Sequence, residues 1–447
     1  MTAHVSTDSS SSLSSRARCP SVDDLSNDSV SFENGSPVHL NTVGVHAPRE
    51  SKIVLRPLGD TLPVDILGFS SVSDPKVIRG ICVSQVPGWS SVPADTLIVS
   101  QLCEGLSNQI FKVSLPSVVG SQPSSGSPVH RSSAYSCVLF RVHGKDSNTL
   151  YDTDMELEIF KTLSKYGIGP RLIARDVQKN WRIEEWHFSV TVPCRSLQNP
   201  SIFCQVASAL ARFHKLHQRR DFPAIFPKKP ATIVRLHSWG ENALKVSFSD
   251  NYQAERLRDL RVPEMVKESN WFCSEIEKRV NQINASGDGL DVVFSHNDVQ
   301  ENNLLQTPYG LRLIDFEYAH YNYQAYDIGN FFCEFTMDYT EKAYPFFSTD
   351  ISSAPAISKK QIFASVYLSE YLETPVLPSD CELIDPLLKN VEFFEMASHL
   401  KWGLWSVIRA PQAPTFEQFD FLLYARFRFD QYLRSKRKLL ETTSKHS

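Results

Sequence analysis

The stretch of chain from residue 295 to residue 315, SHNDVQENNLLQTPYGLRLID, contains three side chains whose types and spacing suit phosphoryl transfer. Asp298 belongs to a His-x-Asp pattern, Asn303 follows it by five residues, and Asp315 ends an apolar run. A hydroxyl nucleophile needs a carboxylate that accepts or orients its proton, and ATP needs hard oxygen ligands that hold magnesium against its phosphates. We interpret Asp298 as the candidate for the first task, and Asn303 and Asp315 as candidates for the second.

Local patterns predict how these side chains come together. Residues 291–294 form a short apolar run, and two further apolar runs flank a turn at 307–310. This pattern predicts a loop followed by a β-hairpin, whose pairing would bring Asn303 and Asp315 into one site. The polar residues of the loop could instead only satisfy its backbone groups. The strand context on both sides favours the chemical interpretation.

The length and composition of the chain are those of a globular enzyme. It has 447 residues, of which 42% are hydrophobic and 11% aromatic, so it can bury a large core as one bilobal unit or two domains. A net charge of -4 argues against a nucleic-acid partner. No window approaches the roughly 20 apolar residues of a membrane span, so we expect no stable membrane insertion. Nine cysteines without a Cys-x-x-Cys or zinc spacing suit reduced thiols in a cytoplasmic protein.

Changes in composition divide the chain into lobes and tails. Residues 1–50 are rich in Ser, Asp, Asn and Pro, which predicts a disordered tail without a signal peptide. We expect an ATP-binding lobe at 51–186, interrupted by a flexible insertion at 116–133. A second lobe at 187–437 would carry the catalytic segment, and a flexible tail would follow at 438–447.

The first lobe contains candidate phosphate-binding groups. Strand-like runs flank a turn with Ser107 and Asn108, whose hydroxyl and backbone N–H groups could contact phosphates. An ordinary hairpin turn is the alternative. Arg141 is a lone cation in the apolar strand 137–142, and a buried cation needs a partner.

Two acidic residues on the predicted helix 152–166 compete for Arg141, namely Glu156 and Glu158. An anchored cation above the nucleotide phosphates is the arrangement of protein-kinase-like folds. The strand-like run 182–186 ends where the chain leaves this lobe. Backbone around Glu185 could therefore contact adenine, or could be a plain linker.

The second lobe combines an amphipathic helix at 203–219 with aromatic residues near the C-terminus. We expect no metal ion at its His214 and His217, because no third ligand accompanies them at a suitable spacing. Asp327 is predicted to hydrogen-bond the catalytic loop. Trp402 and Trp405 are one helical turn apart, and we place Tyr339 and Tyr424 on helices of the same lobe. Aromatic faces attract cations, while core packing is the alternative role.

Four long motifs resemble the choline/ethanolamine kinase family, a branch of the protein-kinase-like fold. They are HNDVQENN at 296–303, LIDFEYAHYNYQAYDIGNFFCEF at 313–335, WGLWS at 402–406 and YARFRFDQY at 424–432. The resemblance extends from about residue 97 to residue 433. It implies a bilobal α+β fold with an antiparallel sheet in a small N-terminal lobe and a larger, mainly helical C-terminal lobe. It also implies ATP and Mg²⁺ as cofactors, an amino alcohol as substrate, a place in phospholipid biosynthesis, and a homodimer.

The resemblance also implies a role for each matching residue. Asp298 would be the catalytic base beside Gln300 and Asn303, and Asn303 and Asp315 would bind magnesium. The nucleotide side would consist of Ser107, Asn108, Arg141, Glu156 and Glu185. The amine would be surrounded by Glu334, Tyr339, Trp402, Trp405 and Tyr424.

The choice between choline and ethanolamine stays open. Asn302 stands where choline kinases of the family commonly have Gly, and its side chain would affect the loop or the fit of the amine. Gln300 and the two tryptophans resemble the choline side of the family, whereas FDFLLYARFRFDQY at 419–432 is similar to ethanolamine kinases. An ethanolamine-specific kinase and a catalytically silent binding protein are the alternatives. A protein kinase fits less well, because Asp315-Phe316-Glu317 replaces a DFG segment and no Ala-Pro-Glu signature follows.

Overall fold

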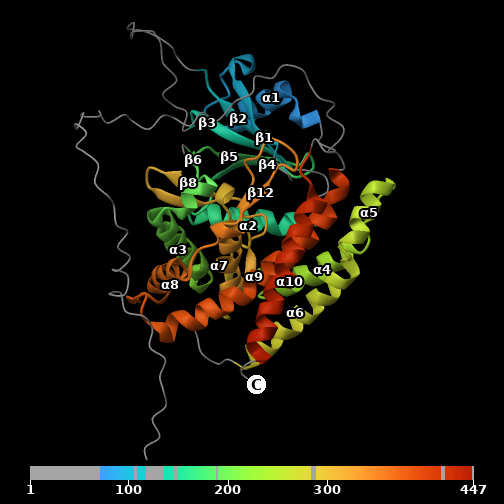
Figure 1. Cartoon of the computed structure of the whole chain (residues 1–447). Helices are drawn as coiled ribbons and strands as arrows, with labels where there is room; N and C mark the ends of the chain where they lie inside the picture. Colours follow the sequence, from blue (N-terminus) through green and yellow to red (C-terminus); the bar gives the residue numbers. More distant parts are fainter. Residues whose placement is uncertain are drawn as a thin grey trace, which may run out of the picture.

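The computed structural model describes residues 71–104, 108–116, 135–143, 150, 152–187, 190–282, 288–413 and 418–444. They form a small lobe around an antiparallel sheet, at the top of Figure 1, and a larger, mainly helical lobe below it. The predicted bilobal α+β fold is therefore confirmed. The predicted tail at 1–50, nearly all of the predicted insertion at 116–133, and Ser107 lie outside the described residues.

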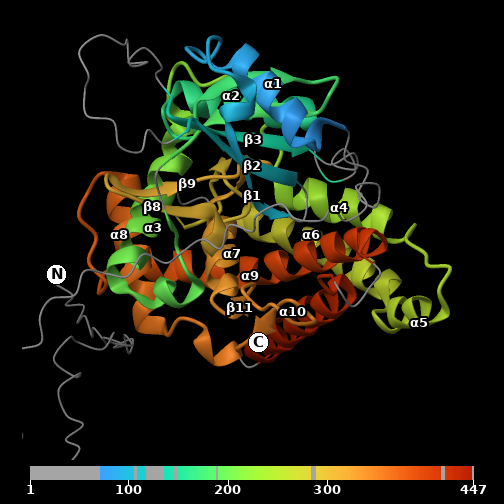
Figure 2. The ribbon, with the colours of Figure 1, turned by 90° about the horizontal axis from the view of Figure 1, so that it is seen from above.

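The small lobe contains a five-stranded sheet with the strand order β1-β2-β3-β5-β4, in which all neighbours are antiparallel. Its strands are β1 (Ile98–Glu104), β2 (Asn108–Ser114), β3 (Cys137–His143), β4 (Leu172–Asp176) and β5 (Trp181–Glu185). Helices α1 (Pro75–Gln85) and α2 (Thr153–Lys165) and the short 3₁₀ turns η2 (Ser71–Ser73) and η3 (Ala94–Thr96) accompany the sheet. Figure 2 shows α1 and α2 above the strands.

The side chains of β3 alternate between two environments. Val138, Phe140 and Val142 are fully buried and belong to the core of the small lobe. Because successive side chains of a strand point to opposite faces, Arg141 faces away from that core. The strand thus directs the cation toward the large lobe.

Helix α2 forms where the sequence predicts it. The Asp152 side chain caps its N-terminus by accepting hydrogen bonds from the backbone N–H groups of Asp154 and Met155, each at 3.0 Å. Such a cap satisfies amide groups that have no partner within the helix. Ile159, Leu163 and Glu156 are buried on its inner face.

The large lobe holds three small antiparallel sheets and eight helices among the described residues. The paired strands are β6 (Val190–Thr191) with β8 (Leu304–Thr307) and β9 (Gly310–Leu313), β7 (Val292–Ser295) with β10 (His320–Tyr323), and β11 (Met337–Asp338) with β12 (Ser348–Thr349). The helices are α3 (Pro200–His214), α4 (Ala231–Ala243), α5 (Asn251–Asp259), α6 (Val262–Gln282), α7 (Gln324–Glu334), α8 (Ile357–Leu372), α9 (Cys381–Arg409) and α10 (Phe421–Ser444). The 3₁₀ turns are η5 (Cys194–Gln198), η6 (Lys215–Gln218), η7 (Glu301–Asn303), η8 (Ile351–Ser353) and η9 (Ala410–Gln412).

Helices α7, α9 and α10 form the centre of the large lobe. Every residue of α7 is buried, and α10 lies alongside α9 (Figures 1 and 2). Two glycines permit these close approaches. A Cβ atom at Gly329 would lie 2.9 Å from the backbone oxygen of Val391 on α9, and one at Gly403 would lie 2.3 Å from the ring of Phe429 on α10. Side chains at either position would therefore push the helices apart.

The C-terminal helix is longer than the sequence suggests. Helix α10 continues to Ser444, so it runs through most of the flexible tail that we predict at 438–447. The tail prediction was wrong for these residues. Many charged residues lie between the apolar positions near the end of this helix. That composition resembles a flexible tail, although the segment continues the packed first part of the helix.

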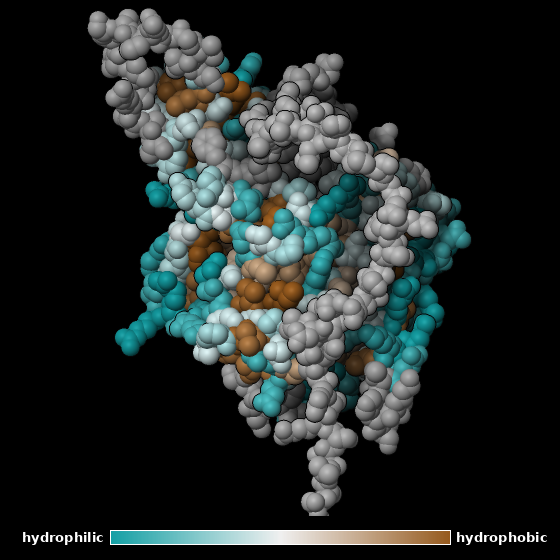
Figure 3. All heavy atoms as spheres, turned by 60° about the vertical axis from the view of Figure 1, so that its left-hand side comes forward, coloured by the Kyte–Doolittle hydropathy of each residue, from teal (hydrophilic) through white to brown (hydrophobic). Residues whose placement is uncertain are grey.

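On the face seen in Figure 3, hydrophilic side chains lie around hydrophobic ones that are visible near the middle and at the upper left. No helix among the described residues combines the length and the apolar character needed to cross a lipid bilayer. The cysteines with free thiols among the described residues include Cys82, Cys137, Cys194, Cys204, Cys273 and Cys333. Cys381 is disulfide-bonded, so the prediction of reduced thiols was wrong for this residue.

Candidate active site

The loop between β7 and the β8–β9 hairpin is held from below by Asp327 of α7. One carboxylate oxygen of Asp327 accepts a hydrogen bond from the backbone N–H of His296 and the other from that of Asn297, both at 2.7 Å. Burial alone would raise the pKa of Asp327, but its hydrogen bond with His214 and the charges nearby lower it. The predicted contact of Asp327 with the loop is confirmed. His214 Nε2 lies 3.0 Å from Asp327, and His214 Nδ1 lies 2.7 Å from the Tyr367 hydroxyl.

Asp298 and Asn303 contact each other directly. The amide nitrogen of Asn303 donates to the carboxylate and to the backbone oxygen of Asp298, each at 2.9 Å. Burial and the charges of Glu334 and Asp315 raise the pKa of Asp298 to about 7, although Lys401 and the hydrogen bond from Asn303 act in the opposite direction. A carboxyl group that titrates near neutral pH is well matched to proton acceptance.

The hairpin brings Asp315 back to Asn303. Leu304 of β8 is paired with Leu313 of β9, and the backbone N–H of Ile314 donates to the Asn303 oxygen at 3.0 Å. Asp315 has a φ of +62°, so its backbone is in the left-handed region, which costs a non-glycine residue about 1–3 kcal/mol. The predicted hairpin is present, and both residues lie at its open end.

The donor set at this end fits a magnesium ion. Asp315 Oδ1 is buried and accepts no hydrogen bond from any described residue. Asn303 contributes an amide, and both groups present the oxygen ligands that Mg²⁺ prefers. Within the described ranges, no group of three or more His, Cys, Asp or Glu side chains could hold a metal ion alone. The remaining ligands would therefore come from water and phosphate oxygens, as is usual for Mg²⁺.

Arg141 is paired differently from our prediction. Its Nε donates to Glu184 Oε1 at 3.0 Å, and its Nη1 lies 3.6 Å from Asp315. Glu156 instead accepts from Arg182 at 2.6 Å, and Glu158 pairs with Lys161 on the surface. The prediction that Glu156 or Glu158 holds Arg141 was therefore wrong.

Strand register explains the correct pairing. Arg141 on β3 is directly opposite Arg182 on β5, and Glu184 is two residues further along β5 on the same face. The carboxylate of Glu184 thus accepts from both guanidinium groups, at 3.0 Å and 2.6 Å. Burial would raise the pKa of Glu184, but the charges of Arg182 and Arg141 lower it to about 2.

Asn108 connects the two lobes. Its side-chain amide donates to Glu317 Oε2 at 3.2 Å, and Glu317 is two residues after Asp315 in the chain. Burial and the charge of Asp315 raise the pKa of Glu317 to about 8. Glu185 ends β5, and its backbone N–H donates to the Arg171 oxygen at 2.8 Å.

Gln300 and Asn302 contact each other at the outer side of the loop. The Gln300 side-chain oxygen accepts hydrogen bonds from the backbone and side-chain nitrogens of Asn302, at 3.4 Å and 3.1 Å. Asn302 is exposed. Its side chain therefore extends toward Gln300 and solvent. Neighbouring Glu301 is buried, and burial raises its pKa to about 8.

Glu334, Tyr339 and Tyr424 converge as predicted, around a cation that we did not predict. The Tyr339 hydroxyl donates to Glu334 at 2.8 Å and lies 3.0 Å from the Tyr424 hydroxyl. Arg428, which is fully buried, donates to Glu334 at 2.5 Å and to Tyr424 at 2.6 Å. Tyr424 is on α10, but Tyr339 follows β11 in a loop, so its placement on a helix was wrong. Helix α7 already ends at Glu334.

The two tryptophans of α9 are buried and hydrogen-bonded. Trp402 Nε1 donates to the Asn330 side chain at 2.7 Å, and Trp405 Nε1 donates to the Tyr318 hydroxyl at 2.9 Å. Their rings meet edge to face with centroids 5.6 Å apart. Tyr318 also lies edge-on to Trp402, at 5.5 Å.

A continuous set of rings joins the tryptophans to the tyrosines. Phe421 lies 5.5 Å from Trp405 and 5.0 Å from Phe419, which in turn lies 5.4 Å from Tyr424. We call this set the aromatic cluster; its members are Tyr318, Tyr339, Trp402, Trp405, Phe419, Phe421 and Tyr424. All the residues predicted to surround the amine belong to it or, like Glu334, contact it. Tyr318, Phe419, Phe421 and Arg428 were not predicted, although the two Phe residues and Arg428 are part of FDFLLYARFRFDQY.

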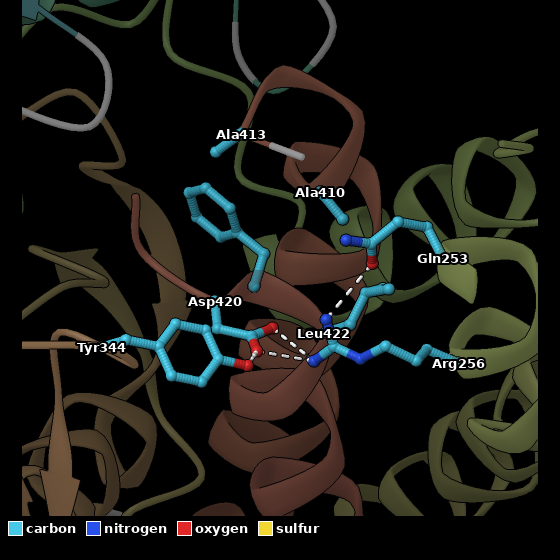
Figure 4. A pocket seen from close by; sticks show the side chains of 8 residues that line it. Gln253, Arg256, Tyr344, Ala410, Ala413, Asp420 and Leu422 are labelled. Carbon is cyan, nitrogen blue, oxygen red and sulfur yellow. Dashed lines mark hydrogen bonds and ion pairs between the residues drawn. The ribbon is translucent and has the colours of Figure 1, made fainter. Parts of the chain in front are cut away.

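Residues that line a small pocket beside the aromatic cluster hold the start of α10 in place (Figure 4). Arg256 of α5 donates to both oxygens of Asp420 at 2.6 Å, and the Tyr344 hydroxyl donates to the same carboxylate. Asp420 also accepts from the backbone N–H of Leu423 at 2.9 Å. These bonds position Phe421, which lines the pocket and packs on Trp405.

The fold and the site together define the class of the molecule. The small lobe, with its antiparallel sheet, places Arg141 above the loop that carries Asp298, the candidate base. The hairpin after this loop presents the amide of Asn303 and the carboxylate of Asp315. This is the arrangement of phosphotransferases with a protein-kinase-like fold.

Comparisons with known proteins identify the family. Residues 99–433 match the family model for choline/ethanolamine kinases. The human choline/ethanolamine kinase is 31% identical over 366 residues, which are 80% of this chain and 84% of that protein. A probable choline kinase of Arabidopsis thaliana is 32% identical over 306 residues, 68% of this chain and 79% of that one. The crystal structure of a choline kinase from Cryptosporidium parvum matches with a TM-score of 0.70 and 32% identity, covering 83% of this chain and 97% of that chain. The chain belongs to the choline/ethanolamine kinase family.

Proposed function

We propose that this protein is a magnesium-requiring kinase that transfers the γ-phosphoryl group of ATP to the hydroxyl of choline and of ethanolamine. The product would be phosphocholine or phosphoethanolamine, for the synthesis of phospholipids. The observation that carries the proposal is the contact between Asp298 and Asn303 at 2.9 Å, with Asp315 beside them at the open end of the hairpin. The cytoplasmic location and the homodimer that we expect from the sequence are part of this proposal.

In the proposed mechanism Asp298 accepts the proton of the substrate hydroxyl. Its raised pKa, near 7, keeps the conjugate acid accessible at neutral pH. The Asn303 amide fixes the carboxylate through a hydrogen bond at 2.9 Å, so the acceptor oxygen needs no reorientation during the reaction. Arg141, directed by Glu184, would contact the nucleotide phosphates from the small lobe.

Asn303 and Asp315 would hold the magnesium ion. When bound, the ion neutralises the charge that develops on the transferring phosphoryl group. The Oδ1 atom of Asp315 supports this assignment, because it is buried and accepts no hydrogen bond from a described residue, and Arg141 approaches it only to 3.6 Å.

The aromatic cluster would recognise the amine. A quaternary ammonium has no N–H to donate, so it gains mainly from the faces of aromatic rings. A primary ammonium can donate three hydrogen bonds and prefers a carboxylate. The cluster offers rings, while Glu334 offers a carboxylate whose two oxygens are engaged by Arg428 and Tyr339. The presence of both supports two substrates.

The test is a comparison of wild type with Asp298→Asn. We expect the variant to fold and to bind a non-hydrolysable ATP analogue with wild-type affinity, and its turnover with either amine to fall by about 10²–10⁴-fold. Asp350→Asn, which changes an exposed carboxylate, is the matched control. Near-normal turnover in Asp298→Asn would refute the assignment of the base. If the wild type consumes no ATP with choline or ethanolamine, the protein is a silent binding module; if it does so only with ethanolamine, it is an ethanolamine-specific kinase.

A further inference from the structure

Lys401 is a buried amine beside the proposed catalytic loop. It lies on α9 with only 1% of its surface exposed, and its Nζ donates to the backbone oxygen of Asn297 at 2.5 Å. None of the described carboxylates lies within ion-pair distance of this nitrogen. A buried amine at such a position is costly unless its surroundings compensate, so its presence needs a physical account.

Aromatic rings supply part of the compensation. The Lys401 Nζ lies 4.0 Å from the centroid of Trp402, 5.1 Å from that of Tyr326, 5.3 Å from that of Tyr318 and 5.9 Å from that of Trp239. Ring faces attract an ammonium through their quadrupole. The rings therefore confine the nitrogen, while the carbonyl of Asn297 gives it a direction.

Asn297 is the residue immediately before Asp298, and its own polar groups are all engaged. Its backbone N–H donates to Asp327, and its side-chain nitrogen donates to the backbone oxygens of Tyr318 and His320. Its side-chain oxygen accepts from the Asn322 side chain at 2.7 Å. Its φ of +66° is in the left-handed region. Such a backbone persists only where the surroundings determine it.

The side chains of Asp327 and Lys401 contact the two ends of the Asn297 backbone. Asp327 accepts from its N–H at 2.7 Å, and Lys401 donates to its carbonyl at 2.5 Å. The carbonyl belongs to the peptide group that links Asn297 to Asp298. Rotation of that peptide would break the bond with Lys401, and it would also turn the Asp298 side chain away from its present direction.

We infer that Lys401 is a positioning residue for the proposed reaction: by donating to the Asn297 carbonyl it fixes the peptide that aims the Asp298 carboxylate at the substrate hydroxyl. An amine donates in both of its protonation states, so this role does not depend on the charge of Lys401. The inference rests on the proposed function of Asp298. It adds a residue that touches neither ATP nor the reacting atoms.

The test compares Lys401→Met with Lys401→Gln. Methionine keeps an apolar stem of similar volume but has no donor, whereas glutamine keeps a neutral donor that is one atom shorter. A displacement of about 1 Å at a catalytic group can cost on the order of 100-fold in rate. We therefore expect kcat of Lys401→Met to fall by about 10- to 100-fold with the KM for ATP unchanged, and Lys401→Gln to recover most of the loss.

The outcomes separate this inference from its alternatives. Wild-type kcat in Lys401→Met would overturn it, because space-filling would then be the only role of the side chain. An equal loss of kcat in both folded variants would also overturn it, because the donor would then not matter. If Lys401→Met fails to fold, Lys401→Gln decides alone: near-normal kcat supports the inference, and a loss as large as that of Asp298→Asn refutes it. An inactive wild type would instead refute the proposed function.

Discussion

In the buried charge network of the small lobe, we expect substitutions of two carboxylates, Glu184 and Glu156, to have different effects on ATP binding. Glu184 accepts from both Arg141 and Arg182, while Glu156 accepts from Arg182 alone among the described residues. In Glu184→Gln, Arg182 keeps the charge of Glu156, but the one carboxylate left near Arg141 among the described residues is Asp315, at 3.6 Å. Arg141 is therefore held less firmly in this variant than in Glu156→Gln, which is the matched control.

The magnitude follows from burial and from the pKa of Glu184. Removing one partner of a buried ion pair costs about 3–5 kcal/mol. The pKa of Glu184 is lowered from 4.5 to about 2, and at 1.36 kcal/mol per pKa unit this corresponds to about 3 kcal/mol. The two values agree. Because the folded pKa is depressed, this stability is present above pH 4.5 and is lost as the pH falls toward 2.

Urea unfolding and steady-state kinetics test the prediction. We expect Glu184→Gln to lower the free energy of unfolding by about 3 kcal/mol at pH 7, with a smaller difference from wild type at pH 3. We expect its KM for ATP to rise about tenfold or more, since a hydrogen bond to a charged group contributes about 1.5–3 kcal/mol. Glu156→Gln should destabilise the lobe without a comparable rise in KM. An equal rise of KM in both variants would refute the pairing of Arg141 with Glu184.

Three further predictions concern the large lobe. Trp405→Ala should reduce kcat/KM for choline more than for ethanolamine; equal and negligible effects would assign Trp405 to the core alone. Gly403→Ala should lower the free energy of unfolding by about 1–3 kcal/mol, because its Cβ would lie 2.3 Å from the Phe429 ring; an unchanged thermal midpoint would contradict the close approach of α9 and α10. Asp315→Asn should raise the Mg²⁺ concentration required for half-maximal turnover, and a metal requirement equal to that of wild type would exclude Asp315 as a ligand.

Local features of the chain were predictable because they depend on neighbouring residues. The apolar runs around 307–310 predicted the hairpin, and its pairing follows directly from the turn. The helix predicted at 152–166 is present as α2. Asp298, Asn303 and Asp315 share one short segment, so their convergence needed no knowledge of the rest of the chain.

Contacts between distant segments were not predictable in the same way. The partner of Arg141 depends on the register of β3 against β5, which places Arg182 opposite it and Glu184 beside it. Spacing along α2 carries no information on that register. Lys401 and Arg428 are missed for a related reason: the groups that they contact, the Asn297 backbone and Glu334, are on other elements. Lys401 is nevertheless a single cation in the apolar stretch HLKWGLWSV of α9, and such a residue is a signal that can be searched for.

The hydrogen bond between Ile314 and Asn303 closes the β8–β9 hairpin at its base, while Tyr309 at the tip is 93% exposed. The spacing of the two proposed metal ligands is therefore set where the strands meet, and the outer turn contributes nothing to it. A peptide epitope or a fluorescent label inserted between Pro308 and Tyr309 would extend into solvent and leave that spacing intact. The same property allows this turn to lengthen or shorten during evolution without any change in the chemistry at its other end.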